Sequence, residues 1–445
     1  MQESITGGNP ERIVMRKGGL ALFLKAGGMV SQYVFTLAVA RLCGPVELGR
    51  FTLAYTLLQL LNIVTLLGLD NLLTRKLAAA KAEKDTAAFQ AAYRNILRIV
   101  IISSILCAGL LYLTAEPISL YLFHDPLLAN GLRWMALALP AFSLITLHAA
   151  AYRGVRNMTG FSAYRILIPL FNTGLLLIFL QSNPSSDIAQ PFTLACMIIC
   201  LAYLFLWRKQ VPKNLHEQSV RSNTRLVLNE SLPMMITGSV FFIMNWTDNL
   251  LIGLLGTARE LAYYDSAFKL ASVTALALMA INAIQAPLFA EAYQRKDMPG
   301  LADLVYKSTR MLFITTIPAS ILIVLFAKPL LGLFGPEFVS GELAMKILVA
   351  GNVVNALTGS VGILLQMTGH QQEYNRIILW SSLLSVLLCI VLIPKYGIVG
   401  AAIASSATRI IQNLFALRRA YLSLGIISIW IPGMPHVKPQ QDTKS

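Results

Sequence analysis

Four charged side chains lie inside long apolar runs of this sequence, where charges are otherwise rare: Lys25, Asp248, Lys269 and Arg409. A charge in such a setting is costly and usually faces a water-filled cavity or pairs with another charge. Lysine and arginine bind anionic groups, and the planar guanidinium of arginine makes bidentate contacts with phosphate. Because three of the four are cations, the set predicts an anion-binding cavity.

Asp248 and Lys269 are predicted to lie at similar depth. They flank the polar segment "GTARE" symmetrically, each about 10 Å from the end of its apolar run in a helix that rises 1.5 Å per residue. An ion pair between them is therefore expected. Two interpretations remain open: the pair only neutralises two costly charges, or Asp248 takes up a proton or cation and releases Lys269 towards a ligand.

The other two cations differ in their depth. Lys25 lies roughly seven residues into the first apolar run, where a lysine can either reach back to the interface or capture a phosphate. Arg409 lies near the middle of the last run, so it reaches the interface less easily. Ion pairing with another helix is the alternative to phosphate binding for Arg409.

Uncharged amides in or beside the apolar runs form a second candidate set. They could hydrogen-bond hydroxyl groups of a ligand, although bonding between helices is their commoner role. The candidates are Asn245, Asn282, Gln285, Asn355 and Gln366, with Asn352 beside them. The sequence has no phosphate-binding loop and no Cys or His pair with metal-ligand spacing, so we expect no metal and no cofactor.

The elements that position these residues are transmembrane helices. The chain has 445 residues, of which 56% are hydrophobic and only 13% charged, which indicates an integral membrane protein. Twelve apolar runs approach the roughly 20 residues that a membrane-spanning helix needs. They cover residues 18–40, 51–73, 93–114, 131–153, 163–182, 190–208, 231–255, 263–289, 311–334, 343–367, 376–394 and 397–419.

The basic residues support this count. Most of the 36 lysines and arginines fall in alternate connections between the runs, as expected when basic loops stay in the cytoplasm. Both termini are therefore predicted to be cytoplasmic. The net charge of +15 reflects topology, and nucleic-acid binding is not expected. Arg153 and Arg156, at the inner end of residues 131–153, could meet a substrate, but the same anchoring role explains them first.

A weak internal repeat suggests two halves. "LCGPVELGRFTLA" after the first run is echoed by "LLGTARELAYYDSA" after the seventh. The repeat favours two six-helix bundles related by a pseudo-two-fold axis, with a substrate path between them. The predicted parts are a cytoplasmic segment 1–17, a first bundle 18–208, a basic linker 209–230, a second bundle 231–419, and a tail 420–445 whose residues 421–435 lie at the interface with Trp430 as an anchor.

Six motifs in order carry a family resemblance over residues 18–420. They are "ARLCGPVELGRF", "GLDNLLTRKLA", "DNLLIGLLGTARELAYYDSAFKLA", "INAIQAPLFAEAY", "LFGPEFVSGELAMKILVAGNVVNAL" and "LIPKYGIVGAAIA". Together they resemble the polysaccharide export and lipid-linked oligosaccharide flippases, which include the O-antigen (Wzx-type) flippases. That family shares a superfamily with multidrug and toxin extrusion (MATE) proteins and lipid II flippases.

The resemblance implies a MATE-like fold and a transporter rather than an enzyme. The expected activity is flipping of undecaprenyl-diphosphate-linked oligosaccharides across the bacterial inner membrane by alternating access, for O-antigen, capsule or exopolysaccharide assembly. Lys25, Lys269 and Arg409 would then face the diphosphate, the amides would contact sugars, and Asp248 would couple transport to protons or sodium. Implied partners are a polysaccharide polymerase and a chain-length regulator.

Two alternatives have different signatures. A multidrug or cation antiporter of the same superfamily shares the fold, but such exporters tend to carry acidic residues in the first helix, where this chain has Lys25. A membrane-embedded polymerase or acyltransferase typically needs a sizeable outer loop, and every predicted outer loop here is short.

Overall fold

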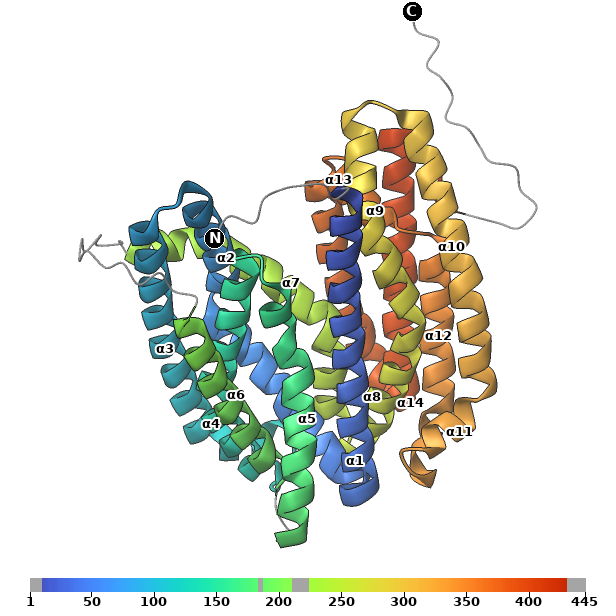
Figure 1. Ribbon diagram of the computed structural model, residues 1–445. Coiled ribbons are helices and arrows are strands. Elements are labelled where there is room, and N and C mark those ends of the chain that lie inside the picture. Colours follow the sequence, from blue (N-terminus) through green and yellow to red (C-terminus); the bar gives the residue numbers. More distant parts are fainter. Residues whose placement is uncertain (1–9, 183–186, 210–223, 430–445) are drawn as a thin grey trace, which may run out of the picture. The chain divides into compact units, whose positions relative to one another are not determined.

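The computed structural model describes residues 10–182, 187–209 and 224–429, and within these ranges all regular elements are helical (Figure 1). The α-helices are α1 Pro10–Leu66, α2 Leu69–Glu83, α3 Thr86–Pro117, α4 Leu128–Gly154, α5 Met158–Ser182, α6 Ala189–Arg208, α7 Thr224–Leu255, α8 Ala258–Ser272, α9 Leu276–Gln294, α10 Met298–Leu325, α11 Ala327–Gly332, α12 Glu342–Leu357, α13 Val361–Met367 and α14 Gln371–Leu424. Short turns η1 Ile118–Leu122, η2 Val273–Ala275 and η3 Pro336–Gly341 complete them.

The helices are those of a multi-pass membrane protein. Among the described residues, eight helices are long and apolar enough to cross a bilayer, or up to ten when each of two bent pairs is taken as one span. The two longest helices, α1 and α14, each cover two of the predicted spans. Helix α1 ends at Leu66, so it leaves out the last residues of the span 51–73. The count of twelve spans and the cytoplasmic location of the termini stay predictions.

The two long helices are bent where their predicted spans meet. In α1 the backbone leaves helical geometry at Gly44 (φ 84°, ψ 175°), which is followed by Pro45. In α14 it does so at Gly397 (φ 56°, ψ −135°), three residues after Pro394. Side chains with a Cβ rarely adopt such angles, and proline removes a helical hydrogen bond. Each glycine therefore divides a continuous helical stretch into two segments.

Other predicted spans are interrupted as well: 311–334 is divided between α10 and α11, and 231–255 contains a bend of 51° within α7. The run 263–289 is divided by η2 between α8 and α9, and the run 343–367 is divided between α12 and α13. At the break between α12 and α13 Gly359 has a φ of +71°. The backbone at Gly68 is left-handed (φ 75°, ψ 5°), and α2 begins directly after it. Helix α1 therefore ends at Leu66, before the end of the predicted span 51–73.

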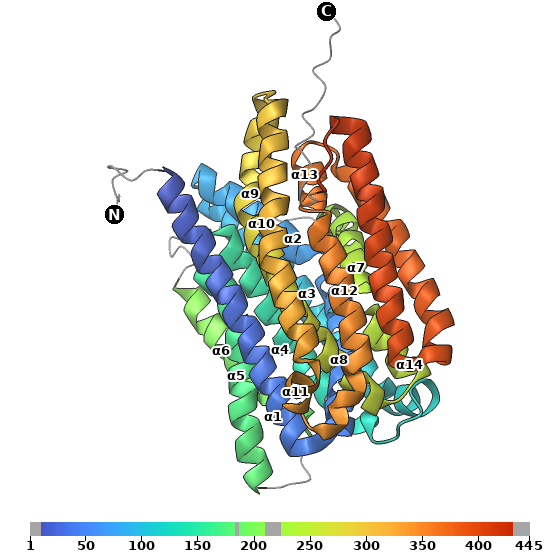
Figure 2. The same cartoon turned by 90° about the vertical axis from the view of Figure 1, so that its right-hand side faces the viewer.

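The described chain forms two compact units. The N-terminal unit is Gly19–Leu254, and the C-terminal unit is Leu255–Ser445 together with Met1–Gly18. In the N-terminal unit α4 contacts α2, α3, α5 and α6. In the C-terminal unit α12 contacts α8, α10 and α14, and Figure 2 shows it between α10 and α14. These central helices hold the fourth predicted span and the first part of the tenth, which the internal repeat would make equivalent.

The boundary between the units differs from the predicted linker 209–230, because α7 belongs to the N-terminal unit. Its contacts explain this membership. Trp246 of α7 packs against Tyr55 of α1 with ring centroids 5.6 Å apart. A Cβ on Gly253 of α7 would come within 2.4 Å of Leu53. Whether the functional halves divide before or after α7 stays a prediction.

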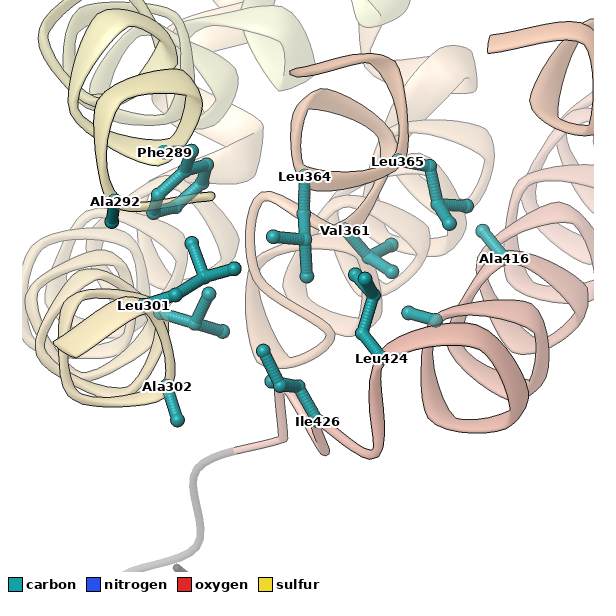
Figure 3. Close-up of a cluster of buried hydrophobic side chains, with 12 residues drawn as sticks. Phe289, Ala292, Leu301, Ala302, Val361, Leu364, Leu365, Ala416, Leu424 and Ile426 are labelled. Atoms are coloured by element: carbon teal, nitrogen blue, oxygen red, sulfur yellow. The ribbon is translucent and has the colours of Figure 1, made fainter. Parts of the chain in front are cut away.

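One end of the C-terminal unit is held by an apolar cluster from four helices and the segment that follows α14 (Figure 3). Phe289 of α9, Leu301 of α10 and Leu364 of α13 are fully buried there. The chain returns after α14, so Ile426 joins the cluster and Ser428 Oγ donates to Thr358 O over 2.6 Å. Trp430 lies outside the described residues, and the interfacial position of 421–435 stays a prediction.

Candidate functional site

Arg409 reaches a neutral amide inside the C-terminal unit. Its Nη1 on α14 donates a hydrogen bond to Oδ1 of Asn352 on α12, which is only 5% exposed. The amide nitrogen of Asn352 donates in turn to Ala271 O over 2.9 Å and to Thr274 Oγ1 over 3.0 Å. One asparagine thus connects a guanidinium on α14 to the helix break between α8 and α9.

The close approach of α12 and α14 makes this contact possible. A Cβ on Gly351 would lie 2.8 Å from Ser406 Oγ, so only glycine fits there without a shift. Ser406 Oγ also donates to Ile347 O on α12 over 3.0 Å. Small residues bring helix backbones together in membrane proteins and let polar side chains bond between them.

A second amide pair lies one turn further along the same two helices. Asn413 Nδ2 on α14 donates to Asn355 Oδ1 on α12 over 2.8 Å. Residues three or four apart share a helix face, so this pair continues the line of the Arg409–Asn352 contact. Of the predicted amides, Asn355 is therefore part of the polar contact surface between α12 and α14.

Lys269 is paired within its own helix. Its Nζ lies 2.5 Å from Oδ2 of Asp265, one turn earlier on α8, and the side chains are 20% and 7% exposed. Asp265 was missed in the sequence, although the i, i+4 spacing of an acid before a lysine is the signal that finds such pairs. Ala271, whose carbonyl oxygen accepts from Asn352, follows Lys269 by two residues, so Lys269 and the Asn352 contact both lie near the end of α8.

Asp248 lies on α7 and is half-buried. It belongs to the N-terminal unit, whereas Lys269 belongs to the C-terminal unit. The ion pair between Asp248 and Lys269 therefore stays a prediction. Asp265 is a second candidate for the carboxylate that pairs with Lys269.

The remaining predicted residues are placed separately. Gln285 of α9 accepts a long hydrogen bond of 3.5 Å from Ser360. Asn282 Oδ1 is buried and has no hydrogen-bond partner among the described residues. Asn245 is exposed on α7, and Gln366 is half-buried on α13. Lys25 lies on α1, but its side chain is outside the described part of the structure.

The site's chemistry is that of a polar contact surface with cations. Within the described ranges no group of three or more His, Cys, Asp or Glu side chains could hold a metal ion. The groups that are brought together are a guanidinium, an ammonium paired with a carboxylate, and several amides. Such groups bind phosphates and hydroxyls through hydrogen bonds.

Comparison with known sequences gives a family-level match. Residues 38–339 match the model of a family described as polysaccharide biosynthesis protein. The probable low-salt glycan biosynthesis flippase Agl15 of Haloferax volcanii is 24% identical over 231 residues, which cover 52% of this chain and 48% of that protein. The probable flippase AglR of the same organism is 21% identical over 177 residues, covering 39% and 37%. The chain thus spans about half, or less, of the length of these curated relatives.

Solved structures agree in fold. The lipid II flippase MurJ in an inward closed conformation superimposes with a TM-score of 0.70 at 13% identity, covering 90% of this chain and 87% of that one. An inward-facing multidrug resistance MATE family transporter gives 0.69 at 13% identity, covering 89% and 94%. At such identities the likeness establishes a MATE-like fold and leaves the cargo open.

Proposed function

Because the chain belongs to the polysaccharide biosynthesis protein family, we propose that it flips lipid-linked oligosaccharides across a membrane by alternating access. Two relatives are described as probable flippases, which supports transport of lipid-linked glycans in general. This proposal makes the protein a transporter rather than an enzyme. Its partners are the glycolipid and the bilayer.

The proposed cargo is an oligosaccharide repeat unit on undecaprenyl diphosphate, moved across the bacterial inner membrane. In this proposal the glycan then enters O-antigen, capsule or exopolysaccharide assembly through a polymerase and a chain-length regulator. A diphosphate with attached sugars presents two kinds of group to the protein: anionic oxygens and hydroxyls. Arginine, lysine and amide side chains are suited to these two kinds.

The observation that carries the proposal is the contact between Arg409 and Asn352. A guanidinium inside an apolar helical unit is costly, and such charges usually serve transport. Here it bonds to a neutral amide that is itself fixed by Ala271 and Thr274. This bond positions the guanidinium on the polar contact surface between α12 and α14. We assign Arg409 to the diphosphate and Lys269 and Lys25 to the same cationic path.

The test is deletion of the gene and complementation with variants. Loss of the flippase should leave the lipid-linked intermediate on the cytoplasmic leaflet and reduce surface polysaccharide. Wild type should restore both, Arg409→Gln should restore little, and Arg409→Lys should restore part because it keeps the charge without the bidentate fork. Glu116→Gln, a change at an exposed surface carboxylate, is the control and should complement fully.

One outcome would contradict the proposed function. If the intermediate does not accumulate in the deletion strain and surface glycan is normal, the chain does not flip this cargo. Altered drug susceptibility in that strain would then point to the multidrug antiporter function.

A further inference from the structure

Two arginines at one end of the N-terminal unit share an aromatic ring. The guanidinium carbons of Arg153 on α4 and Arg165 on α5 each lie 5.4 Å from the ring centroid of Phe161. Arg165 also lies 5.8 Å from the ring of Tyr164. Stacking on an aromatic face fixes the plane of a guanidinium and leaves its N–H edge available.

The hydrogen bonds of both guanidinium groups go to neutral oxygens. Arg153 Nη2 donates to Asn71 Oδ1 over 2.9 Å and to Thr74 Oγ1 over 3.1 Å, and its Nε reaches the same hydroxyl over 3.3 Å. Arg165 Nε reaches Tyr164 Oη over 3.4 Å. In the part of the chain that the structure describes, neither arginine forms an ion pair with a carboxylate. Arg165 is exposed, so an anion can approach it.

The start of α5, which carries the ring, is held rigidly. Tyr203 of α6 inserts its hydroxyl between Gly160 O, to which it donates over 2.7 Å, and Tyr164 N, from which it accepts over 3.0 Å. Gly160 packs on the ring of Tyr152, where a Cβ would come within 2.5 Å. Binding sites are precise when rigid elements position them.

The first helix borders the same place. A Cβ on Gly28 of α1 would lie 3.2 Å from Arg165 Cβ, so α1 passes closely beside α5. Lys25 precedes Gly28 by three residues, about one helical turn. Its side chain lies outside the described part of the structure, so the receiving site is argued from the two arginines alone.

We propose that Arg153 and Arg165, stacked on Phe161, form a receiving site for the diphosphate of a lipid-linked substrate at the cytoplasmic end of the N-terminal unit. This inference rests on the proposed flippase function and on the predicted cytoplasmic location of this end. The exposed guanidinium of Arg165 offers its fork to one phosphate, and Arg153, held in place through its Nε and Nη2, adds a second positive charge and its Nη1 donor. The receiving site is built from α2, α4 and α5 of the N-terminal unit, whereas the Arg409–Asn352 contact belongs to the C-terminal unit.

The ligand chemistry, a phosphate on a lipid, has two sources: the polyprenyl diphosphate and ordinary anionic phospholipids. The test uses the purified full chain in detergent with three probes: geranylgeranyl diphosphate, geranylgeranyl monophosphate and phosphatidylglycerol. We expect tighter binding of the diphosphate than of the other two. Arg165→Gln should weaken diphosphate binding about tenfold, and the Arg153→Gln/Arg165→Gln pair by more, because each removes charge-assisted hydrogen bonds.

Matched variants separate the site from general positive charge. Arg156→Gln removes one exposed charge between α4 and α5 and should leave diphosphate affinity unchanged within about twofold. Phe161→Leu keeps every charge and removes the ring, and it should weaken binding severalfold. The melting temperature of each variant, measured without probe, checks that the unit still folds.

Three results would overturn the inference: unchanged diphosphate affinity in the folded Arg153→Gln/Arg165→Gln protein, an equal loss in Arg156→Gln, or equal binding of phosphatidylglycerol, which would assign the site to bulk lipid. Failure of the proposed function looks different. In that case the wild-type gene fails to relieve accumulation of the lipid-linked intermediate in cells, whatever the purified protein binds.

Discussion

At the residue scale, the two cations of the C-terminal unit are held in different ways. Lys269 has a carboxylate one turn away on α8, and Arg409 has a buried amide on another helix. The pair on α8 ties Lys269 to its own helix, whereas the bond to Asn352 makes Arg409 part of the polar contact surface between α12 and α14.

A double-mutant cycle can decide which carboxylate serves Lys269. Removing one partner of a largely buried pair leaves an uncompensated charge, at a cost of about 3 kcal/mol, while removing both costs much less. We expect strong coupling between Lys269→Met and Asp265→Asn in thermal or denaturant unfolding of the purified protein. The parallel cycle with Asp248→Asn measures the ion pair predicted from the sequence. Additive effects of Lys269→Met and Asp265→Asn would contradict the contact on α8.

Asn352 should matter for stability more than an exposed amide does. Asn352→Ala removes the hydrogen bonds to Arg409, Ala271 and Thr274. The expected cost is about 1–3 kcal/mol, seen as a lower melting temperature. Gln294→Ala, at an exposed position at the end of α9, is the control and should change the melting temperature little. Equal melting of both variants would remove Asn352 from the contacts that hold α8, α12 and α14 together.

The sequence identified most of these residues but not their partners. Lys269, Arg409 and Asn355 are visible as polar groups in apolar runs. Asn352 as the acceptor for Arg409 depends on how α12 and α14 rotate against each other, which the apolar pattern of a membrane helix hardly encodes. Arg153 looks like a topology anchor in the sequence, because its stacking on Phe161 exists only when α4 and α5 are packed.

At the element scale, apolar runs located the helices, and local chemistry decided where they break. Gaps between the first two and last two spans lie at or directly beside the bends at Gly44 and Gly397. The breaks at η2 and between α12 and α13 lie inside single predicted spans, and the second falls where Thr358, Gly359 and Ser360 interrupt the apolar pattern. The break at η2 lies beside Ala271 O and Thr274 Oγ1, which both accept hydrogen bonds from Asn352 on α12. A contact between helices that are distant in the sequence cannot be read from the local hydropathy.

The helix α5 offers a matched pair of glycines for a test of packing. A Cβ on Gly160 would come within 2.5 Å of the Tyr152 ring, and that ring is packed against Trp207 with centroids 5.0 Å apart. Since the ring has little room to move, Gly160→Ala should destabilise the N-terminal unit by about 1–3 kcal/mol. At Gly174, on the same helix, a Cβ would meet no atom of the described structure within 4 Å.

Gly174→Ala is therefore the control, and it should stabilise slightly because alanine favours helix by about 0.5–1 kcal/mol over glycine. Thermal melting of the two purified variants measures both effects. Equal shifts of the same sign would mean that Gly160 is not held against Tyr152. A selective loss of melting temperature in Gly160→Ala would support the rigid start of α5 on which the receiving site depends.

At the scale of the whole molecule, the family and the fold are established and the cargo is proposed. The sequence motifs led to the correct family, which the match over residues 38–339 confirms. The arrangement of two functional bundles stays a prediction, because α7 packs with the N-terminal unit although the internal repeat counts it with the second half. Charge patterns predict topology without placing helices next to each other, so the sequence could not decide this point.

Coupling to an ion gradient belongs to this scale, and Asp248 is the residue that tests it. A carboxylate within a membrane helix is expensive and often serves as a proton or cation carrier. If Asp248 carries the coupling ion, Asp248→Asn should lower flipping about tenfold or more in inverted membrane vesicles supplied with a lipid-linked substrate. The residual activity should no longer respond when a protonophore collapses the gradient, because an amide does not titrate.

Glu116→Gln is the matched control, since it makes the same carboxylate-to-amide change at a side chain that is 63% exposed. It should keep both the rate and its response to the protonophore. If Asp248→Asn flips at the wild-type rate and stays equally sensitive, Asp248 has only a structural role. If wild-type flipping responds to sodium depletion and not to the protonophore, and Asp248→Asn loses that response, Asp248 keeps the coupling role and the coupling ion is sodium. Loss of flipping with intact gradient sensitivity would instead assign Asp248 to the cargo path, together with Arg409 and Lys269.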